Sequence, residues 1–155
     1  MRLLVLSIGE SPPRWAEEAA QSYAGRIVDG YSMTLRQLPA ARRGATMDAA
    51  QVRRKEAEAL RAATPADALR VALDERGRPW SSADLAGLLA GWSADGRRPA
   101  FWIGGADGLD PQLLDEADLR WSLSALTLPH ALARVLVAEQ LYRAWSILRG
   151  HPYHR

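Results

Sequence analysis

The chain has 155 residues, which we expect to form one domain over residues 1–155, and with 48% hydrophobic and 25% charged residues it is globular rather than disordered. It contains no cysteine, which excludes a disulfide scaffold, a thiolate zinc site and a cysteine nucleophile. The formal net charge of +2 is spread unevenly, because residues 1–62 carry +3, residues 63–119 carry −5 and residues 120–155 carry +4.

The first half of the chain alternates between strand and helix patterns. The apolar run Arg2–Ile8 predicts a strand. The run is too short to span a membrane and lacks the small-residue cleavage site of a signal peptide. We therefore expect a cytoplasmic protein. Residues 11–27 have a serine cap, prolines and helical apolar spacing. Ser32–Leu38 alternates like a strand, and after a loop residues 46–63 form a charged helix.

The second half continues the alternation. We expect strands at residues 68–74, 99–105 and 119–128, a helix capped by Ser81 or Ser82, and a long final helix that begins near Pro129. This order is typical of an α/β fold with a mostly parallel sheet and helices on both faces.

The final helix is apolar around most of its girth. The residues that form its wide apolar stripe are Leu132, Val135, Leu136, Val137, Leu141, Tyr142, Ala144, Trp145, Ile147 and Leu148. Such a helix is buried on two sides, and in a small chain the second side fits another subunit. We therefore expect a homodimer.

Two stretches at the ends of predicted strands could bind a ligand. In IGGADGL, residues 103–109, three glycines allow positive φ and close backbone approach where parallel sheets bind ligands; a tight turn into a short helix capped by Asp110 is the alternative. Residues 122–130, SLSALTLPH, could offer backbone groups and an apolar wall to an uncharged ring such as adenine. A core strand followed by a helix cap is the alternative there, with His130 as a neutral hydrogen-bonding residue.

Other catalytic patterns are missing from the sequence. The histidines are His130, His151 and His154, and none has a partner at metal-ligand spacing, so we expect no metal. Neither a G-x-S-x-G nor a Walker motif occurs, which argues against hydrolases and nucleotide triphosphatases. Two of these histidines fall in RGHPYHR, residues 149–155, a cluster of titratable and stacking groups in a region usually rich in small polar residues.

Nineteen of the twenty basic residues are arginine, whose planar guanidinium can donate two hydrogen bonds to one phosphate. A GC-rich genome is the alternative explanation. The basic side chains that could touch RNA phosphates, or form an ordinary solvated face, are Arg42, Arg43, Arg53, Arg54 and Lys55.

Several stretches together resemble one known family. They are the opening LLVLSIG, then LDERGRPWSS and FWIGGADGL, and finally WSLSALTLPHALARVLVAEQLYRAWSILRGHPYHR. They are similar to the RlmH (YbeA) family of bacterial 23S ribosomal RNA pseudouridine N3-methyltransferases of the SPOUT class. The resemblance covers nearly the whole chain and is most specific in its last third.

This resemblance implies an α/β fold with a deep trefoil knot at its C-terminal end, a homodimer, and S-adenosylmethionine as the methyl donor. The implied substrate is 23S rRNA within the ribosome. The implied cofactor contacts are Leu73, Gly104, Gly105, Leu123, Ser124, Ala125, Leu126, Thr127 and Leu128.

The implied nucleophile is N3 of pseudouridine, an imide nitrogen that must lose or share its proton before it attacks the methyl group. Candidate catalytic residues are His154 as base or proton shuttle, Tyr153 as a stacking or hydrogen-bonding group, and Arg143 and Arg155 as anchors for phosphate or carbonyl oxygens. We expect the tail of one subunit to complete the site of the other.

Two alternatives stay open at this point. One is a ribosome-binding or assembly factor that keeps the fold without the chemistry, against which the intact glycine loop and tail argue. The other is a SPOUT methyltransferase that acts on transfer RNA, against which the lack of an added RNA-binding domain argues.

Overall fold

A computed structural model describes all residues of the chain except Arg43 and Ala45. It has a five-stranded sheet in the order β2-β1-β4-β3-β5, and every pair of neighbouring strands is parallel, as the alternation predicts. The strands are β1 (Arg2–Ile8), β2 (Ser32–Leu38), β3 (Leu69–Arg78), β4 (Pro99–Ile103) and β5 (Leu119–Trp121). The helices are α1 (Arg14–Arg26), α2 (Ala49–Ala63), α3 (Ser82–Ala94), α4 (Pro111–Glu116), α5 (His130–Leu148) and the 3₁₀ turn η1 (Pro152–His154).

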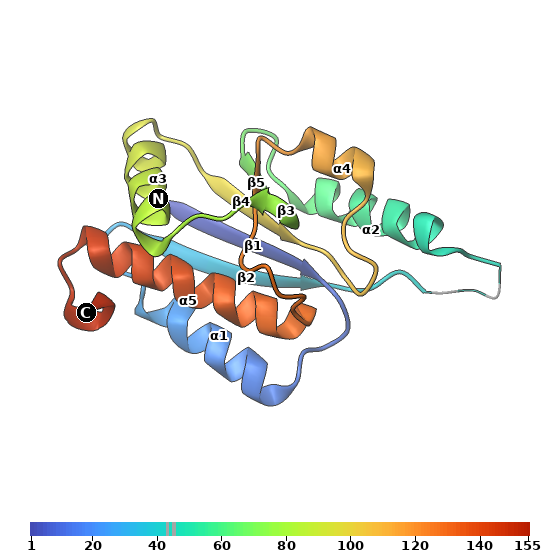
Figure 1. The fold of residues 1–155 in the computed structure, drawn as a ribbon, viewed down its shortest axis with the longest axis horizontal. Helices are drawn as coiled ribbons and strands as arrows, with labels where there is room; N and C mark the ends of the chain where they lie inside the picture. The colour runs from blue at the N-terminus through green and yellow to red at the C-terminus, as the bar shows by residue number, and fades with distance from the viewer. Residues whose placement is uncertain (43, 45) are drawn as a thin grey trace.

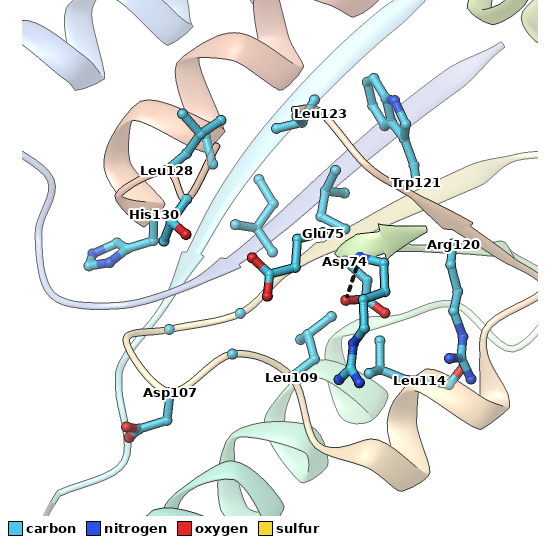
Figure 2. Close-up of a pocket in the computed structure, with 18 of the residues that line it drawn as sticks. Asp74, Glu75, Asp107, Leu109, Leu114, Arg120, Trp121, Leu123, Leu128 and His130 are labelled. Carbon is cyan, nitrogen blue, oxygen red and sulfur yellow. Dashed lines mark hydrogen bonds between the residues drawn. The ribbon is translucent and has the colours of Figure 1, made fainter. Parts of the chain in front are cut away.

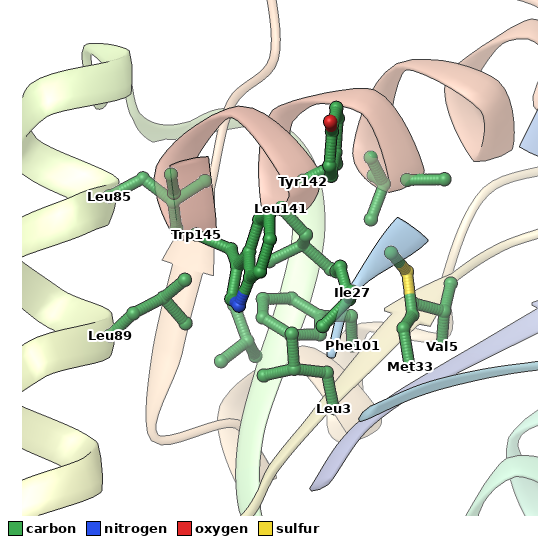
Figure 3. Close-up of a cluster of buried hydrophobic side chains, with 14 of the residues drawn as sticks. Leu3, Val5, Ile27, Met33, Leu85, Leu89, Phe101, Leu141, Tyr142 and Trp145 are labelled. Atoms are coloured by element: carbon green, nitrogen blue, oxygen red, sulfur yellow. The ribbon is translucent and has the colours of Figure 1, made fainter. Parts of the chain in front are cut away.

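Helices cover both faces of the sheet, and α5 runs along one of them between α1 and α3 (Figure 1). Strand β1 shows how alternate side chains serve the two layers. Leu3 and Val5 join the larger core under α1, α3 and α5, whereas Leu6 and Ile8 join the smaller core with residues of α2 and α4. Figure 3 shows the larger core, in which Trp145 of α5 lies with Leu3 and other buried side chains.

The expected strand over residues 119–128 is wrong beyond Trp121, where β5 ends. Residues 122–129 form a loop, and its own hydroxyl groups help to turn it: Ser122 donates to the Ser124 carbonyl at 3.2 Å, and the Ser124 hydroxyl accepts from the Leu126 amide at 2.9 Å. Such local bonds compete with a strand ladder. Strand β3, in contrast, continues beyond the expected end at residue 74 to Arg78.

The helix starts also differ in part from expectation. Pro13 stands at the cap of α1 without a side-chain bond, so the predicted serine cap is wrong. Helix α2 begins at Ala49 with a capping box between Asp48 and Gln51. Ser81, one of the two expected residues, caps α3. Among the described residues, no helix has the length and apolar character to cross a membrane.

Candidate active site

A large pocket lies beyond the carboxyl ends of β3, β4 and β5 (Figure 2). Its volume is 1080 Å³, at the upper end of the range of small-molecule sites. Most of its lining comes from three segments: residues 73–76 of β3, the glycine loop after β4, and the loop that leads from β5 into α5. Parallel sheets place ligands at this edge, so the pocket lies where the sequence predicted a site.

The pocket gathers nearly all of the predicted cofactor contacts. Those that line it are Leu73, Gly104, Gly105, Leu123, Ser124, Leu126, Thr127 and Leu128. Ala125 lies in the same loop but is exposed and does not line the pocket. The residues come from three separate parts of the chain, and the parallel sheet brings them to one edge.

The glycine loop is a tight turn, and it also forms one wall of the pocket. The Gly108 amide donates to the Gly105 carbonyl at 3.0 Å, and only Gly108 of the three glycines has a positive φ, at 77°. A Cβ atom on Gly104 would lie 2.6 Å from the Gly108 carbonyl carbon, so only glycine fits there. The Asp110 side chain then caps α4 by accepting from the Gln112 amide at 3.2 Å. The turn-and-cap alternative is therefore confirmed, and the same turn lines the pocket.

Charged side chains around the pocket include one carboxylate that the sequence analysis missed. Asp74 accepts from the Arg76 amide at 3.2 Å through Oδ1, while its Oδ2 is buried without a hydrogen-bond partner (Figure 2). Nearby, Arg120 forms an ion pair with Asp115 at 2.8 Å. Because Asp74 directly follows Leu73 at the end of the regular strand pairing, its position was the available signal.

The predicted catalytic tail folds back on α5 of its own protomer. The Tyr153 hydroxyl donates to Glu139 Oε1 at 3.0 Å, and its ring lies 4.6 Å from the Tyr142 ring. The Arg143 guanidinium lies 4.9 Å from the Tyr153 ring centre and bonds Glu139 through Nε at 2.8 Å. Glu139, which the sequence analysis also missed, therefore ties two of the predicted residues together.

Burial, with help from neighbouring Tyr23 and Glu139, raises the pKa of Tyr153 well above its ordinary value of 10.0. The Glu139 carboxylate likewise raises the pKa of Arg143. Tyr153 is thus a neutral donor near pH 7 and cannot serve as a base. His154 is half-buried, and its Nδ1 has no hydrogen-bond partner, whereas Arg155 is exposed.

The tail and the pocket lie at opposite ends of α5, and Figure 1 shows the C-terminus near the last turn of this helix. His130, the first residue of α5, lines the pocket, while the tail follows the last residue, Leu148. A helix of 19 residues is about 28 Å long. Within one protomer, therefore, the predicted catalytic and cofactor residues are not brought together.

The basic residues that were predicted to contact RNA phosphates do not all lie at the pocket. Arg53 lines the pocket, while Arg54 and Lys55 are exposed on α2 and Arg42 is exposed in the preceding loop. Arg43 lies outside the described residues. Within the part of the chain that the structure describes, no three histidine, aspartate or glutamate side chains group closely enough to hold a metal ion.

Comparison with known proteins gives a consistent result. A family model described as "Predicted SPOUT methyltransferase" matches residues 1–154. A protein of Thioalkalivibrio sulfidiphilus named "Ribosomal RNA large subunit methyltransferase H" is 46% identical over 100% of this chain and 99% of its own length. A protein of the same name from Acidithiobacillus ferrooxidans is 50% identical over 100% of this chain and 98% of its own length.

Solved structures support the fold. A probable methylase family protein from Haemophilus influenzae superposes with a TM-score of 0.58 at 15% identity, over 99% of this chain and 70% of its own. A probable methyltransferase from Bordetella pertussis gives a TM-score of 0.54 at 18% identity, over 92% of this chain and 95% of its own.

Proposed function

Because the chain belongs to the SPOUT methyltransferase family and is a methyltransferase, we propose that it methylates N3 of a pseudouridine in 23S rRNA on the assembled ribosome. The observation that carries this proposal is the end-to-end similarity to relatives named as large-subunit ribosomal RNA methyltransferases. An enzyme that meets its substrate on ribosomes works in the cytoplasm.

The pocket fits S-adenosylmethionine as the methyl donor. Its volume of 1080 Å³ accommodates a nucleoside with an amino-acid arm, and the loop after β5 offers leucine side chains to an uncharged ring. The unpartnered Oδ2 of Asp74 suits a hydroxyl or ammonium donor of the ligand. In the proposed site Leu73, Gly104 and residues 123–128 hold the donor. Its sulfonium-bound methyl is already activated, so the protein contributes alignment and exclusion of water.

The proposed enzyme is a homodimer in which the tail of one subunit completes the pocket of the other. The separation of tail and pocket along α5 supports this arrangement, because one protomer alone cannot bring them together. The half-exposed side chains Leu132, Val135 and Leu136 of α5 provide an apolar face for the second subunit.

In this composite site His154 accepts the N3 proton, because an imidazole nitrogen can take up a proton and its Nδ1 has no hydrogen-bond partner within the protomer. Tyr153, held neutral, stacks on the base or accepts a hydrogen bond from it. Arg143 and Arg155 stabilise negative charge on the base or its phosphate. Glu139 accepts hydrogen bonds from both Arg143 and Tyr153 and so holds the two side chains next to each other.

The proposed backbone path includes a deep trefoil knot around residues 122–129. The bonding of this segment supports it: the Ser122 amide donates to the Arg78 carbonyl at 3.0 Å, and Trp121 pairs with both Leu73 and Arg78. The chain leaving β5 is therefore held against the irregular part of β3. Mechanical stretching from both ends should leave the chain shorter than a fully extended one, because a tightened knot retains length.

The substrate is tested by incubating the protein and labelled S-adenosylmethionine with ribosomes that lack the modification, with free ribosomal RNA, or with transfer RNA. We expect label only in ribosomes, at a pseudouridine of 23S rRNA identified by nuclease mapping. Label in transfer RNA alone would support the transfer RNA enzyme instead. Ribosome binding without any label would support a non-catalytic assembly factor.

A further inference from the structure

A second hollow lies at the amino ends of the strands, whereas the cofactor pocket lies at their carboxyl ends. It has a volume of 520 Å³ and is formed by the start of β1, the turn before β2, and the turn between α3 and β4. We call it the basic groove; its lining residues are Met1, Arg2, Gly30, Tyr31, Ser32, Ser93, Gly96, Arg97 and Arg98. Three of these side chains are arginines and none is acidic.

The arginine side chains of the basic groove contribute little to the stability of the fold. Arg2, Arg97 and Arg98 are exposed. Arg98 forms an ion pair with Asp67 at 3.1 Å, in which both side chains stay more than half exposed, at 58% and 63%. Exposed pairs of this kind contribute little to stability and exchange easily for another anion. The backbone of this turn, by contrast, is anchored, since the Arg98 carbonyl accepts from the Leu69 amide at 2.9 Å.

The basic groove continues directly to the catalytic tail. The Arg149 guanidinium lies 5.3 Å from the ring centre of Tyr31, a groove residue, and also donates to the Asp29 carbonyl. Arg149 directly follows α5, and the chain after it returns onto the helix through the bond from the His151 amide to the Ser146 carbonyl at 2.9 Å. One strip of surface thus joins Arg97 and Arg98, through Tyr31 and Arg149, to residues 151–155.

We propose that the basic groove binds the phosphate backbone of ribosomal RNA next to the nucleotide that is methylated. This inference rests on the proposed function. If the tail of one subunit completes the partner's pocket, the groove of that first subunit lies beside the pocket mouth. An RNA strand whose base enters the pocket then passes its phosphates over the arginines. The planar guanidinium of arginine suits this role, because it can donate hydrogen bonds to two oxygens of one phosphate without contacting the bases.

The experiment compares Arg97→Gln/Arg98→Gln with the wild-type dimer, using labelled S-adenosylmethionine and purified 70S ribosomes that lack the modification. We expect the KM for ribosomes to rise at least tenfold, while kcat changes less than twofold and the affinity for S-adenosylmethionine, measured by calorimetry, is unchanged. The slope of log binding constant against log salt should fall in magnitude by about 1 to 2, because roughly one counterion is released per phosphate contact.

The matched control is Arg14→Gln/Arg36→Gln, which removes the same charge from exposed positions and also breaks one exposed ion pair, between Arg14 and Glu18 at 2.7 Å. We expect this control to retain the wild-type KM. An unchanged KM and salt slope in the groove variant, or equal changes in both variants, would overturn the inference while the proposed function stands. A wild-type protein that labels no ribosomes would overturn the proposed function, and the inference with it.

Discussion

The two ends of α5 differ in what they offer to a reaction. At its first residue, His130 borders a pocket that is already assembled within one protomer, mostly from residues 73–76 of β3 and two loops. In its second half and the tail, Tyr153, Glu139 and Arg143 form an ordered cluster, while Arg149 lies against Tyr31 beside a smaller hollow. In the proposed enzyme, the place that holds S-adenosylmethionine is therefore separate from the groups that carry protons and charge. Removing each end in turn should separate binding from chemistry.

The largest expected effect comes from deleting Tyr153–Arg155. Methyl transfer to ribosomes should fall on the order of a thousandfold or more, because the proton acceptor and the groups that hold the base are lost together. The affinity for S-adenosylmethionine, measured by calorimetry, should stay nearly intact. If methylation survives this truncation, the assignment of the tail to catalysis is wrong.

Mixing subunits tests whether the tail acts across the interface. Co-expressed truncated chains and full-length Gly104→Ala chains should form mixed dimers that contain one intact composite site. We expect activity well above that of either parent alone. Activity no higher than the sum of the parents would place tail and pocket of the same chain in one site.

Gly104→Ala should have the next largest effect, confined to the pocket end. The added Cβ would lie 2.6 Å from the backbone of Gly108, so the loop must shift, and overpacking of this kind costs about 1–3 kcal/mol. We expect the affinity for S-adenosylmethionine to fall at least tenfold. Gly87→Ala on α3 is the matched control, because a Cβ there meets nothing within 4 Å, and it should bind like wild type.

Tyr153→Phe tests the tail end through stability. Loss of the bond to Glu139 should lower the free energy of unfolding by about 1 kcal/mol at pH 7. The pKa of Tyr153 is raised on folding, so the stabilisation is fully present below about pH 10 and is lost as the pH rises through the folded-state pKa. Urea denaturation should therefore show the difference between wild type and variant shrinking only at strongly alkaline pH. A difference that vanishes between pH 7 and 9 would contradict the assigned hydrogen bond.

The smallest effect is expected from Arg61→Gln, because Arg61 belongs to α2 and lies at neither end of α5. Arg61 of α2 donates two bonds to Glu116 of α4, behind the glycine loop, and both side chains are about one third exposed. We expect a loss of about 0.5 kcal/mol. Arg61 lowers the pKa of Glu116, so its contribution is present above pH 4.5 and is lost as the pH falls through the folded-state pKa. Acid unfolding of the two proteins should converge; a gap that widens below pH 4 would contradict this.

The sequence predicted the sheet and its helices well because their signals are local. Arg2–Ile8 and Ser32–Leu38 match the observed strands residue for residue, since alternation and apolar runs are properties of the segments themselves. The loop at residues 122–129 was missed because its leucines resemble a strand. What makes it a loop is a set of bonds from Ser122 and Ser124 that the apolar pattern does not reveal.

The pocket residues could be named from the sequence through family resemblance, but not from composition. Leu73, Gly104 and Leu123 are far apart in the chain and meet only because β3, β4 and β5 end at one edge of the sheet. Asp74 and Glu139 were missed for a related reason. Each is an ordinary acidic residue in the sequence, and its role depends on burial or on partners that only the fold provides.

The length of α5 limits how this protein can change during evolution. Inserting a single residue in the helix after Tyr142 would advance everything beyond it by about 1.5 Å and rotate it by about 100°. Tyr153 would then leave Tyr142 and Glu139, the residues that order it. Insertions in the segment that connects β2 and α2 need not move the pocket or the tail. Natural variation in length should therefore accumulate in that segment, while α5 keeps a constant number of residues.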